Sequence, residues 1–263
     1  MRTLDTSRPA WLRVPLPGPA GAVQRLELRL GSASLAAPSK PNEDFYAAVA
    51  PSDADAIGRG VVLAIADGVS GGGSGRVAAE TTVRCVAADY YAAPAHWSVG
   101  QSLDRLLRAA NDWLWAQNGR RPDHDTVVAA VSLLVLRDGH YYLAHVGDTR
   151  VYRLRGGLFK QLSTDHTWQR RDMRHVLRRA VGLDSHLVVD FAGGDIQPRD
   201  TFLMVTDGVW EVLGDANMIE ILRRQPEPQA AADALVDAAH RHQAAYMGRN
   251  DATAIVLRIE PAA

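Results

Sequence analysis

The stretch over residues 61–75, VVLAIADGVSGGGSG, constrains the fold of this chain more than any other. Six apolar residues precede Asp67 and Gly68, and a run of small residues then leads into an alanine-rich helical pattern that starts at Arg76. This order predicts a buried strand that ends at a carboxylate, followed by a glycine-rich turn that leaves open space beside the acid. An Asp-Gly pair that only makes a turn explains this stretch alone equally well.

Two other segments repeat the arrangement of an apolar run followed by an aspartate. They are residues 202–208, FLMVTDG, and, in a looser form, residues 141–148, YYLAHVGD. Three aspartates at the ends of strands predict a shared acidic cluster that contains Asp67, Asp148 and Asp207.

Composition limits the class of protein and its partners. With 263 residues, 47% of them hydrophobic, the chain is long enough to bury a substantial core, and it has no obvious internal linker. We therefore expect a single domain over residues 23–260, preceded by a proline-rich arm over residues 1–22 that is extended or disordered. A formal net charge of -1 gives no electrostatic reason to expect a nucleic acid or an anionic membrane as partner.

Cysteine use and hydropathy indicate the compartment. Cys85 is the only cysteine, so an intrachain disulfide and a zinc-thiolate cluster are both excluded. No run approaches the ~20 apolar residues that cross a bilayer, and prolines and arginine interrupt the N-terminal segment where a signal peptide would need an apolar core. We expect a cytoplasmic protein.

Hydrophobic periodicity predicts an α+β protein. Short Asp-Gly and Gly-Gly turns join neighbouring strands, which indicates an antiparallel meander and excludes a simple Rossmann arrangement. Residues 163–182 are polar, basic and helix-like, and form an insertion between strands. The predicted strands are residues 23–35, 45–50, 61–66, 127–136, 140–146, 151–155, 158–162, 187–191, 202–206 and 254–259, and the predicted helices are residues 76–92, 99–118, 215–224 and 228–245.

Acidic residues lie at the ends of several predicted strands. Carboxylates without a cysteine or a pair of histidines are hard oxygen ligands, which suit Mg²⁺ or Mn²⁺ and disfavour Zn²⁺. For each acid taken alone, a solvated aspartate in a turn remains the alternative. The candidates are Glu43, Asp44, Asp67, Asp148, Asp207 and Asp251.

Six short motifs follow one another along the chain. They are Asn42-Glu43-Asp44, Ala66-Asp67-Gly68-Val69, Gly147-Asp148-Thr149-Arg150, Leu162-Ser163-Thr164-Asp165-His166, Thr206-Asp207-Gly208 and Asn250-Asp251-Ala252-Thr253. With these motifs in this order, the chain resembles, between about residues 26 and 259, the metal-dependent (PPM, type 2C) protein serine/threonine phosphatases, bacterial branch. Residues 177–184, LRRAVGLD, also resemble the stretch that follows the mobile flap of that family.

The resemblance implies a four-layer fold, with two antiparallel sheets packed face to face and flanked by helices, and two Mn²⁺ or Mg²⁺ ions at one end. By the matched positions, Asp67 would bridge the two ions. The Gly68 carbonyl with Glu43 or Asp44 would serve one ion, and Asp207 and Asp251 the other. Asp148 matches the acid that helps to hold a possible third ion. Asp67, Asp207 and Asp251 would be the catalytic residues, since two such ions activate a bridging water.

The chain also departs from the family pattern. Many members carry an arginine three residues before the Asn-Glu-Asp motif to bind the substrate phosphate, and here that position is Ser39. The adjacent Lys40 offers a point charge but not the fork of a guanidinium, so Ser39 and Lys40 are the candidate substrate-binding residues. Eukaryotic members often place a histidine directly after the Asp-Gly pair, where this chain has Val69. We expect His145 and His166 to be structural.

Three functions remain open. The first is a phosphatase acting on phosphoserine or phosphothreonine of a phosphorylated protein, reversing a bacterial serine/threonine kinase. The second is a catalytically weak relative that binds a phosphoprotein as a regulator, and the third is a phosphatase of anti-sigma-factor antagonists. The retained acids favour an enzyme, whereas Ser39 favours the weak relative. Within residues 164–181 we expect arginines such as Arg170 and Arg171 to contact substrate, with a solvated basic helix as the alternative.

Overall fold

The computed structural model describes most of the chain after residue 25. The described residues are 2–3, 13–16, 26–38, 40–51, 58–70, 73–121, 125–168, 173, 176–246 and 250–261. In the segment expected to be an arm, these include two short strands, β1 (Arg2–Thr3) and β2 (Arg13–Leu16). Ser39, Arg170 and Arg171 lie outside the described residues.

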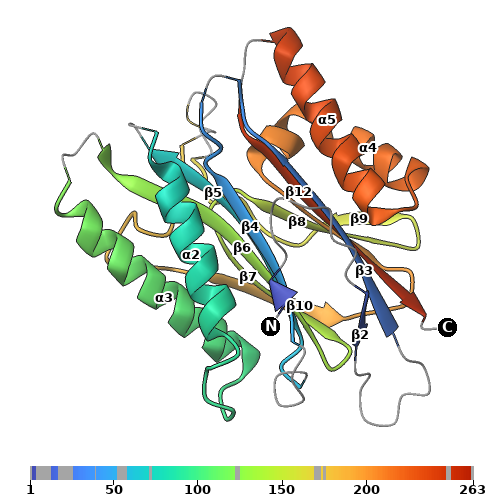
Figure 1. Cartoon of the computed structure of the whole chain (residues 1–263), viewed down its shortest axis with the longest axis horizontal. Coiled ribbons are helices and arrows are strands. Elements are labelled where there is room, and N and C mark those ends of the chain that lie inside the picture. Colours follow the sequence, from blue (N-terminus) through green and yellow to red (C-terminus); the bar gives the residue numbers. More distant parts are fainter. Residues whose placement is uncertain are drawn as a thin grey trace.

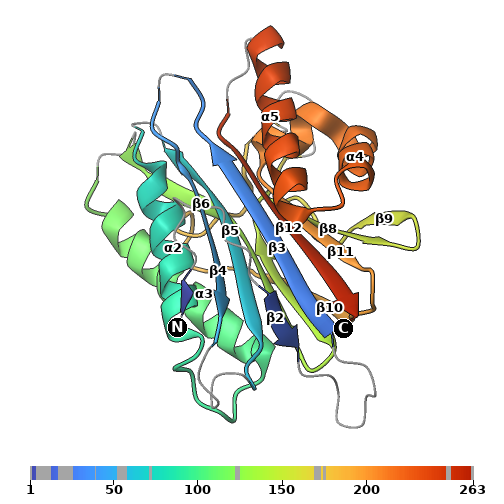
Figure 2. The ribbon, with the colours of Figure 1, turned by 45° about the vertical axis from the view of Figure 1, so that its right-hand side comes forward.

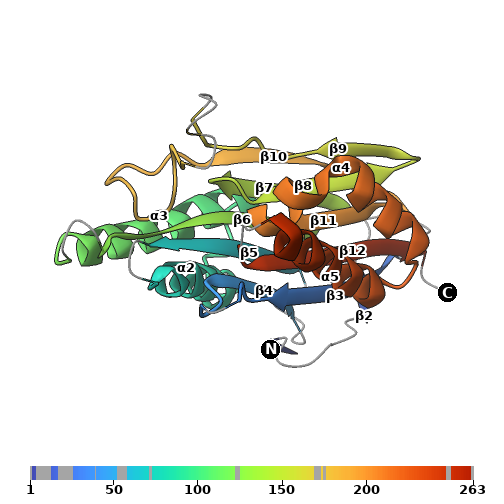
Figure 3. The ribbon, with the colours of Figure 1, turned by 90° about the horizontal axis from the view of Figure 1, so that it is seen from above.

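Two six-stranded antiparallel sheets form the centre of the molecule (Figure 1). The strand order is β1-β4-β5-β6-β7-β10 in the first sheet and β2-β3-β12-β11-β8-β9 in the second. Figure 3 shows that both orders run in the same direction, from the side of β4 and β3 to the edge strands β10 and β9. The strands are β3 (Leu26–Leu35), β4 (Asp44–Ala50), β5 (Val61–Ser70), β6 (Val127–Arg137), β7 (His140–Val146), β8 (Arg150–Arg155), β9 (Leu158–Gln161), β10 (Asp190–Asp195), β11 (Thr201–Val205) and β12 (Ala252–Pro261).

Helices cover the outer face of each sheet, as Figure 2 shows. Helices α2 (Gly75–Asp89) and α3 (Val99–Asn118) pack on the first sheet, and α4 (Asp207–Arg224) and α5 (Pro228–Tyr246) pack on the second. Three apolar cores result, one under each helical layer and one between the sheets. The predicted four-layer α+β sandwich is thereby confirmed.

The central strand β6 shows why this sequence makes four layers. Its residues Val127–Leu136 form one nearly continuous apolar run, and all ten are buried. An antiparallel strand with one solvated face would alternate apolar and polar residues, so a run of this kind requires cover on both faces. Val131 and Val135 belong to the core under α2 and α3, whereas Leu134 and Leu136 belong to the core between the sheets.

The structure corrects four predictions, three of which concern the boundaries of elements. Strand β5 does not end before Asp67 but continues to Ser70, because its edge goes on pairing with β6 as far as Val127. β10 is Asp190–Asp195 and not residues 187–191, and it pairs with β7 over its whole length. α4 begins at Asp207 and not at residue 215, with a break in helical geometry at Gly214 (φ 66°).

The fourth correction concerns the insertion, which was expected to be helix-like. Its described residues, 163–168, 173 and 176–182, contain no helix. Two isolated bridges hold them instead, between Thr167 and Leu177 and between Ala129 and Val181. Among the described residues, no helix has the length and apolar character needed to cross a bilayer.

Candidate metal centre

Adjacent strands of the first sheet bring the first acids together. Asp44 begins β4 and lies directly opposite Asp67 of β5 in the antiparallel register. Beyond Asp67 the chain approaches the start of α2 so closely that a Cβ on Gly68 would lie 2.0 Å from the Gly75 carbonyl oxygen. Only a residue without a side chain fits at this point. The backbone contact between strand and helix thus explains the glycines at both of its ends, Gly68 and Gly75.

The second sheet supplies the other acids. Asp207 is the first residue of α4, directly after β11, and Asp251 directly precedes β12. β11 and β12 are antiparallel neighbours with Val205 opposite Ala254, so both acids lie at the same end of the sheet. Asp148 lies in the turn from β7 of the first sheet to β8 of the second. All five aspartates therefore belong to one end of the sandwich.

Two threonine hydroxyls hold Asp44 in place. Thr206 Oγ1 and Thr253 Oγ1 donate to Asp44 Oδ2 at 2.9 and 2.6 Å. Burial raises the pKa of Asp44 to about 7, against these two hydrogen bonds, which lower it. The other carboxylate oxygen, Oδ1, is buried without a hydrogen-bond partner. One oxygen is thus anchored while the other stays available for a ligand.

Burial and mutual repulsion act on the remaining carboxyl groups. Burial, with the charges of Asp207, Asp44 and Asp148, raises the pKa of Asp67 well above its usual value. Burial, with the charges of Asp207 and Asp165, raises the pKa of Asp148 to about 8. Burial raises the pKa of Asp207 to about 6, although a hydrogen bond from Asp67 lowers it. Nearby positive charge of high density would stabilise the ionised form of each group.

Asp251, Glu43 and Lys40 form a separate network beside these acids. Asp251 accepts the backbone N–H groups of Ala37 at 2.7 Å and Glu43 at 2.8 Å. The Lys40 ammonium lies 3.2 Å from Asp251 Oδ2 and 3.6 Å from Glu43 Oε2. Glu43 Oε1 accepts the N–H of Gly75 at 2.6 Å and so caps the start of α2. Lys40 is therefore the counter-ion of two predicted ligands.

The donor chemistry of these residues fits Mg²⁺ or Mn²⁺. The donors are carboxylate oxygens from buried, crowded acids, and Asp44 Oδ1 lacks any partner. In the described part of the chain, however, no three acidic, histidine or cysteine side chains surround a common point closely enough to ligate one ion. Asp251 faces Lys40 and two backbone amides, and it would have to release Lys40 to join Asp67 and Asp207 at an ion.

The two histidines near the motifs, His145 and His166, lie in a buried network next to the turn that carries Asp148. Gly147 donates its N–H to His166 Nδ1 at 3.1 Å, and His166 Nε2 lies 3.0 Å from Asp190 Oδ2. His145 Nε2 donates to the Thr164 carbonyl at 3.0 Å, and its Nδ1 accepts from Ser132. Both rings hold backbone and side chains of the turn that carries Asp148, in agreement with the structural role expected for them.

Sequence reasoning missed several supporting residues. Thr206 and Thr253 stand inside motifs that were recognised only for their aspartates, and an adjacent hydroxyl was the available signal. Arg76 donates to the backbone carbonyls of Asn42 and Asp44 at 3.0 and 3.1 Å. These hydrogen bonds stabilise the backbone where the loop leads into β4. No local pattern connects Arg76 with residues more than thirty positions away.

Comparison with known proteins identifies the family of the chain. The family model described as Stage II sporulation protein E (SpoIIE) matches residues 58–260. A Listeria innocua protein named Serine/threonine phosphatase stp is 23% identical over 214 residues, which cover 74% of this chain and 83% of that protein.

Solved structures share the fold. The chain superposes on PppA, a regulatory component of T6SS in Pseudomonas aeruginosa, with a TM-score of 0.73 and 25% identity, over 88% of this chain and 97% of that one. The catalytic domain of the phosphatase PstP in complex with two manganese ions gives a TM-score of 0.73 and 24% identity, over 89% of this chain and 99% of that one. On these grounds, the chain belongs to the SpoIIE family within the metal-dependent (PPM, type 2C) protein serine/threonine phosphatases.

Proposed function

We propose that the domain over residues 23–260 hydrolyses phosphoserine and phosphothreonine on proteins. The observation that carries the proposal is the convergence of five aspartates from both sheets at one end of the sandwich, four of them with a raised pKa. Crowded carboxyl groups destabilise the fold unless a cation compensates them, so their presence at one place indicates function. Substrates phosphorylated by a bacterial serine/threonine kinase fit this activity.

Two Mn²⁺ or Mg²⁺ ions would be held by these residues. Asp67 would contact both ions, the Gly68 carbonyl with Glu43 or Asp44 would serve one, and Asp207 with Asp251 the other. Asp148 would help to hold a third ion. When bound, such ions lower the pKa of a water between them and stabilise the charge that develops on the phosphoryl oxygens.

The remaining residues position the acids and the substrate. Thr206 and Thr253 orient Asp44 through Oδ2, which leaves the buried Oδ1 without a hydrogen-bond partner. Lys40 is partly exposed and lies beside Asp251 and Glu43. Once these carboxylates bind a cation, the Lys40 ammonium becomes available for a phosphate oxygen. Lys40 would then take the role of the arginine that many family members carry at the position of Ser39.

The test is hydrolysis of p-nitrophenyl phosphate and of a phosphothreonine peptide with Mn²⁺, with Mg²⁺ and with a chelator. We expect turnover of both substrates with metal and none with the chelator. Tight binding of the phosphopeptide without turnover under any metal condition would instead identify a phosphoprotein-binding regulator. Undiminished turnover with the chelator would contradict the metal-dependent mechanism.

A further inference from the structure

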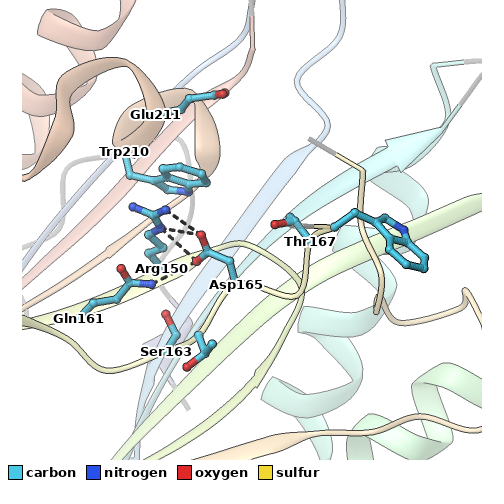
Figure 4. A pocket seen from close by; sticks show the side chains of 9 residues that line it. Arg150, Gln161, Ser163, Asp165, Thr167, Trp210 and Glu211 are labelled. Atoms are coloured by element: carbon cyan, nitrogen blue, oxygen red, sulfur yellow. Dashed lines mark hydrogen bonds and ion pairs between the residues drawn. The ribbon is translucent and has the colours of Figure 1, made fainter. Parts of the chain in front are cut away.

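A pocket of about 650 Å³ opens beside the acidic cluster (Figure 4). Its walls come from the start of α4, the strands β8 and β9 and the segment that follows β9, and include Arg150, Asp165, Trp168, Trp210 and Glu211. No proposed metal ligand lines it. The pocket is therefore adjacent to the centre described above and not part of it.

Short segments connect the pocket to the acids. Trp210 follows Asp207 by three residues on α4, about one helical turn or ~5 Å along the axis. Its indole N–H donates to the backbone carbonyl of Asp148 at 2.9 Å. An extended peptide advances ~3.3 Å per residue. A substrate with its phosphate at the acids can therefore place a side chain one to three residues away into this pocket.

The positive charge inside the pocket is already compensated. Arg150 donates to both oxygens of Asp165 at 2.7–3.1 Å, and also to the Tyr152 hydroxyl. Its guanidinium carbon lies 3.4 Å from the centroid of the Trp210 ring. Figure 4 shows Trp210 stacked over Arg150, with Asp165 beside the guanidinium. All three guanidinium nitrogens of Arg150 thus have a partner, and the side chain forms part of the pocket wall.

The negative charge is not compensated. Glu211 is exposed, lines the pocket and has no hydrogen bond or ion pair with any residue that the structure describes. It lies on the other side of Trp210 from Arg150 (Figure 4). The second aromatic wall, Trp168, is 45% exposed, although the backbone N–H of Trp168 is fixed to the Val176 carbonyl at 3.2 Å. A free carboxylate beside the indole ring of Trp210 is suited to a cation.

From these contacts we infer that the pocket, defined by Trp168, Trp210 and Glu211, binds an arginine side chain of the phosphoprotein within three residues of the phosphorylated residue. A guanidinium stacks on an indole face and pairs with a carboxylate at the same time, which an ammonium does less well. The inference rests on the proposed function and adds to it the class of sequence that the phosphatase prefers.

The experiment compares phosphothreonine peptides that carry arginine, lysine, alanine, phenylalanine or glutamate at each of the three positions on either side. With the parent protein and Mn²⁺, we expect kcat/KM to be about tenfold higher for arginine than for alanine at one position, lower for lysine, and lowest for glutamate. Equal rates for arginine and alanine at all six positions, or a preference for phenylalanine or glutamate, would overturn the inference.

Two substitutions locate the preference. Glu211→Gln and Trp168→Ala should each reduce the ratio of kcat/KM for the arginine peptide to that for the alanine peptide to about threefold or less. The matched controls are Glu220→Gln, on the exposed side of the same helix, and Trp115→Ala, which is also 45% exposed but lies on α3. Both controls should keep the ratio of the parent. A ratio that survives in both pocket variants would assign the preference to another surface.

Turnover of p-nitrophenyl phosphate separates this inference from the proposed function, because that substrate has no flanking residues. If p-nitrophenyl phosphate is hydrolysed but the peptides show no arginine preference, only the inference that the pocket binds arginine is contradicted. If nothing is hydrolysed, the inference about the pocket is tested by binding. The dissociation constants of fluorescently labelled arginine and alanine peptides are then measured by anisotropy. Tighter binding of the arginine peptide in the parent and not in Glu211→Gln would support the pocket, and equal binding would exclude it.

Discussion

Asp67 occupies the position on which both proposed ions depend. Its carboxyl group lies opposite Asp44 in the sheet register and is hydrogen-bonded to Asp207. Asp67→Asn keeps the shape but removes the charge, so we expect Mn²⁺ binding in isothermal titration calorimetry to fall by at least about tenfold, and turnover to disappear. Asp89→Asn, at the far end of α2, is the control and should change neither. Retained turnover in the Asp67 variant would contradict its bridging role.

Lys40 is one of only two lysines in the chain, and its ammonium lies between Asp251 and Glu43. Because it would contact the substrate phosphate once ions occupy the carboxylates, Lys40→Ala should raise KM for a phosphopeptide about tenfold and change kcat little. Steady-state kinetics of Lys40→Ala and of Lys160→Ala, the exposed lysine of β9, provide the comparison. An unchanged KM would mean that phosphate is held without Lys40.

At the scale of elements, Gly68 and Gly75 allow β5 and α2 to touch. A Cβ on Gly68 would lie 2.0 Å from the carbonyl oxygen of Gly75 and 2.9 Å from that of Glu43. Both are backbone atoms, so neither can rotate away as a side chain could. Gly68→Ala should therefore cost about 2 kcal/mol of unfolding free energy and weaken Mn²⁺ binding. Gly100→Ala in α3, where a Cβ meets nothing within 4 Å, should instead leave stability equal or slightly higher. Urea denaturation with and without Mn²⁺ measures both, and equal stability of Gly68→Ala and the parent would contradict the close approach.

Elements with a strong local signal could be predicted from the sequence. The helix over residues 99–118 agrees with α3, since the Ser98 and Gln101 capping box and the apolar face are local features. The end of β5 could not be predicted in this way, because the strand continues past Asp67 only through pairing with β6, which follows more than fifty residues later. The basic segment after β9 looked helical by composition, yet its described residues pair across the isolated bridges at Thr167 and Val181.

For the acidic centre, the sequence predicted one set of acids, and contacts between the sheets decide how these acids are arranged: Glu43 and Asp251 pair with Lys40. The convergence of Asp44, Asp67, Asp148 and Asp207 in one electrostatic cluster agrees with the predicted grouping. The pairing of Lys40 with Asp251, and the pocket behind Trp210, join residues that are distant in the chain. No local period or motif encodes such contacts, so they had to come from the structure.

At the scale of the whole molecule, three separate cores stabilise four layers, and the buried network around His145 joins the first sheet to the turn that leads into the second. Ser132 of β6 links His145 Nδ1 to the Thr149 hydroxyl, at 2.9 and 2.8 Å. His145 is fully buried, so its protonation would place a positive charge in the interior. Its protonation therefore bears on global stability.

Burial, with the nearby His166, lowers the pKa of His145 to about 4 from a usual value of 6.5. Between these two pH values the unfolded chain binds a proton that the folded protein does not, so this residue makes the folded state less stable as pH falls from 6.5 toward 4. The full effect is at most about 3 kcal/mol. His145→Gln should lower stability at pH 7 but flatten the loss between pH 6.5 and 4.

Urea denaturation in a chelating buffer at several pH values measures this effect as the difference in unfolding free energy between variant and parent. Contributions from the acidic cluster are common to both proteins and cancel in that difference. The control is His140→Gln, at the exposed end of the same strand, which exchanges the same side chains outside the buried network. A difference for His145→Gln that stays constant from pH 7 to 4 would mean that His145 titrates alike in the folded and unfolded chain, and that its burial does not contribute to acid sensitivity.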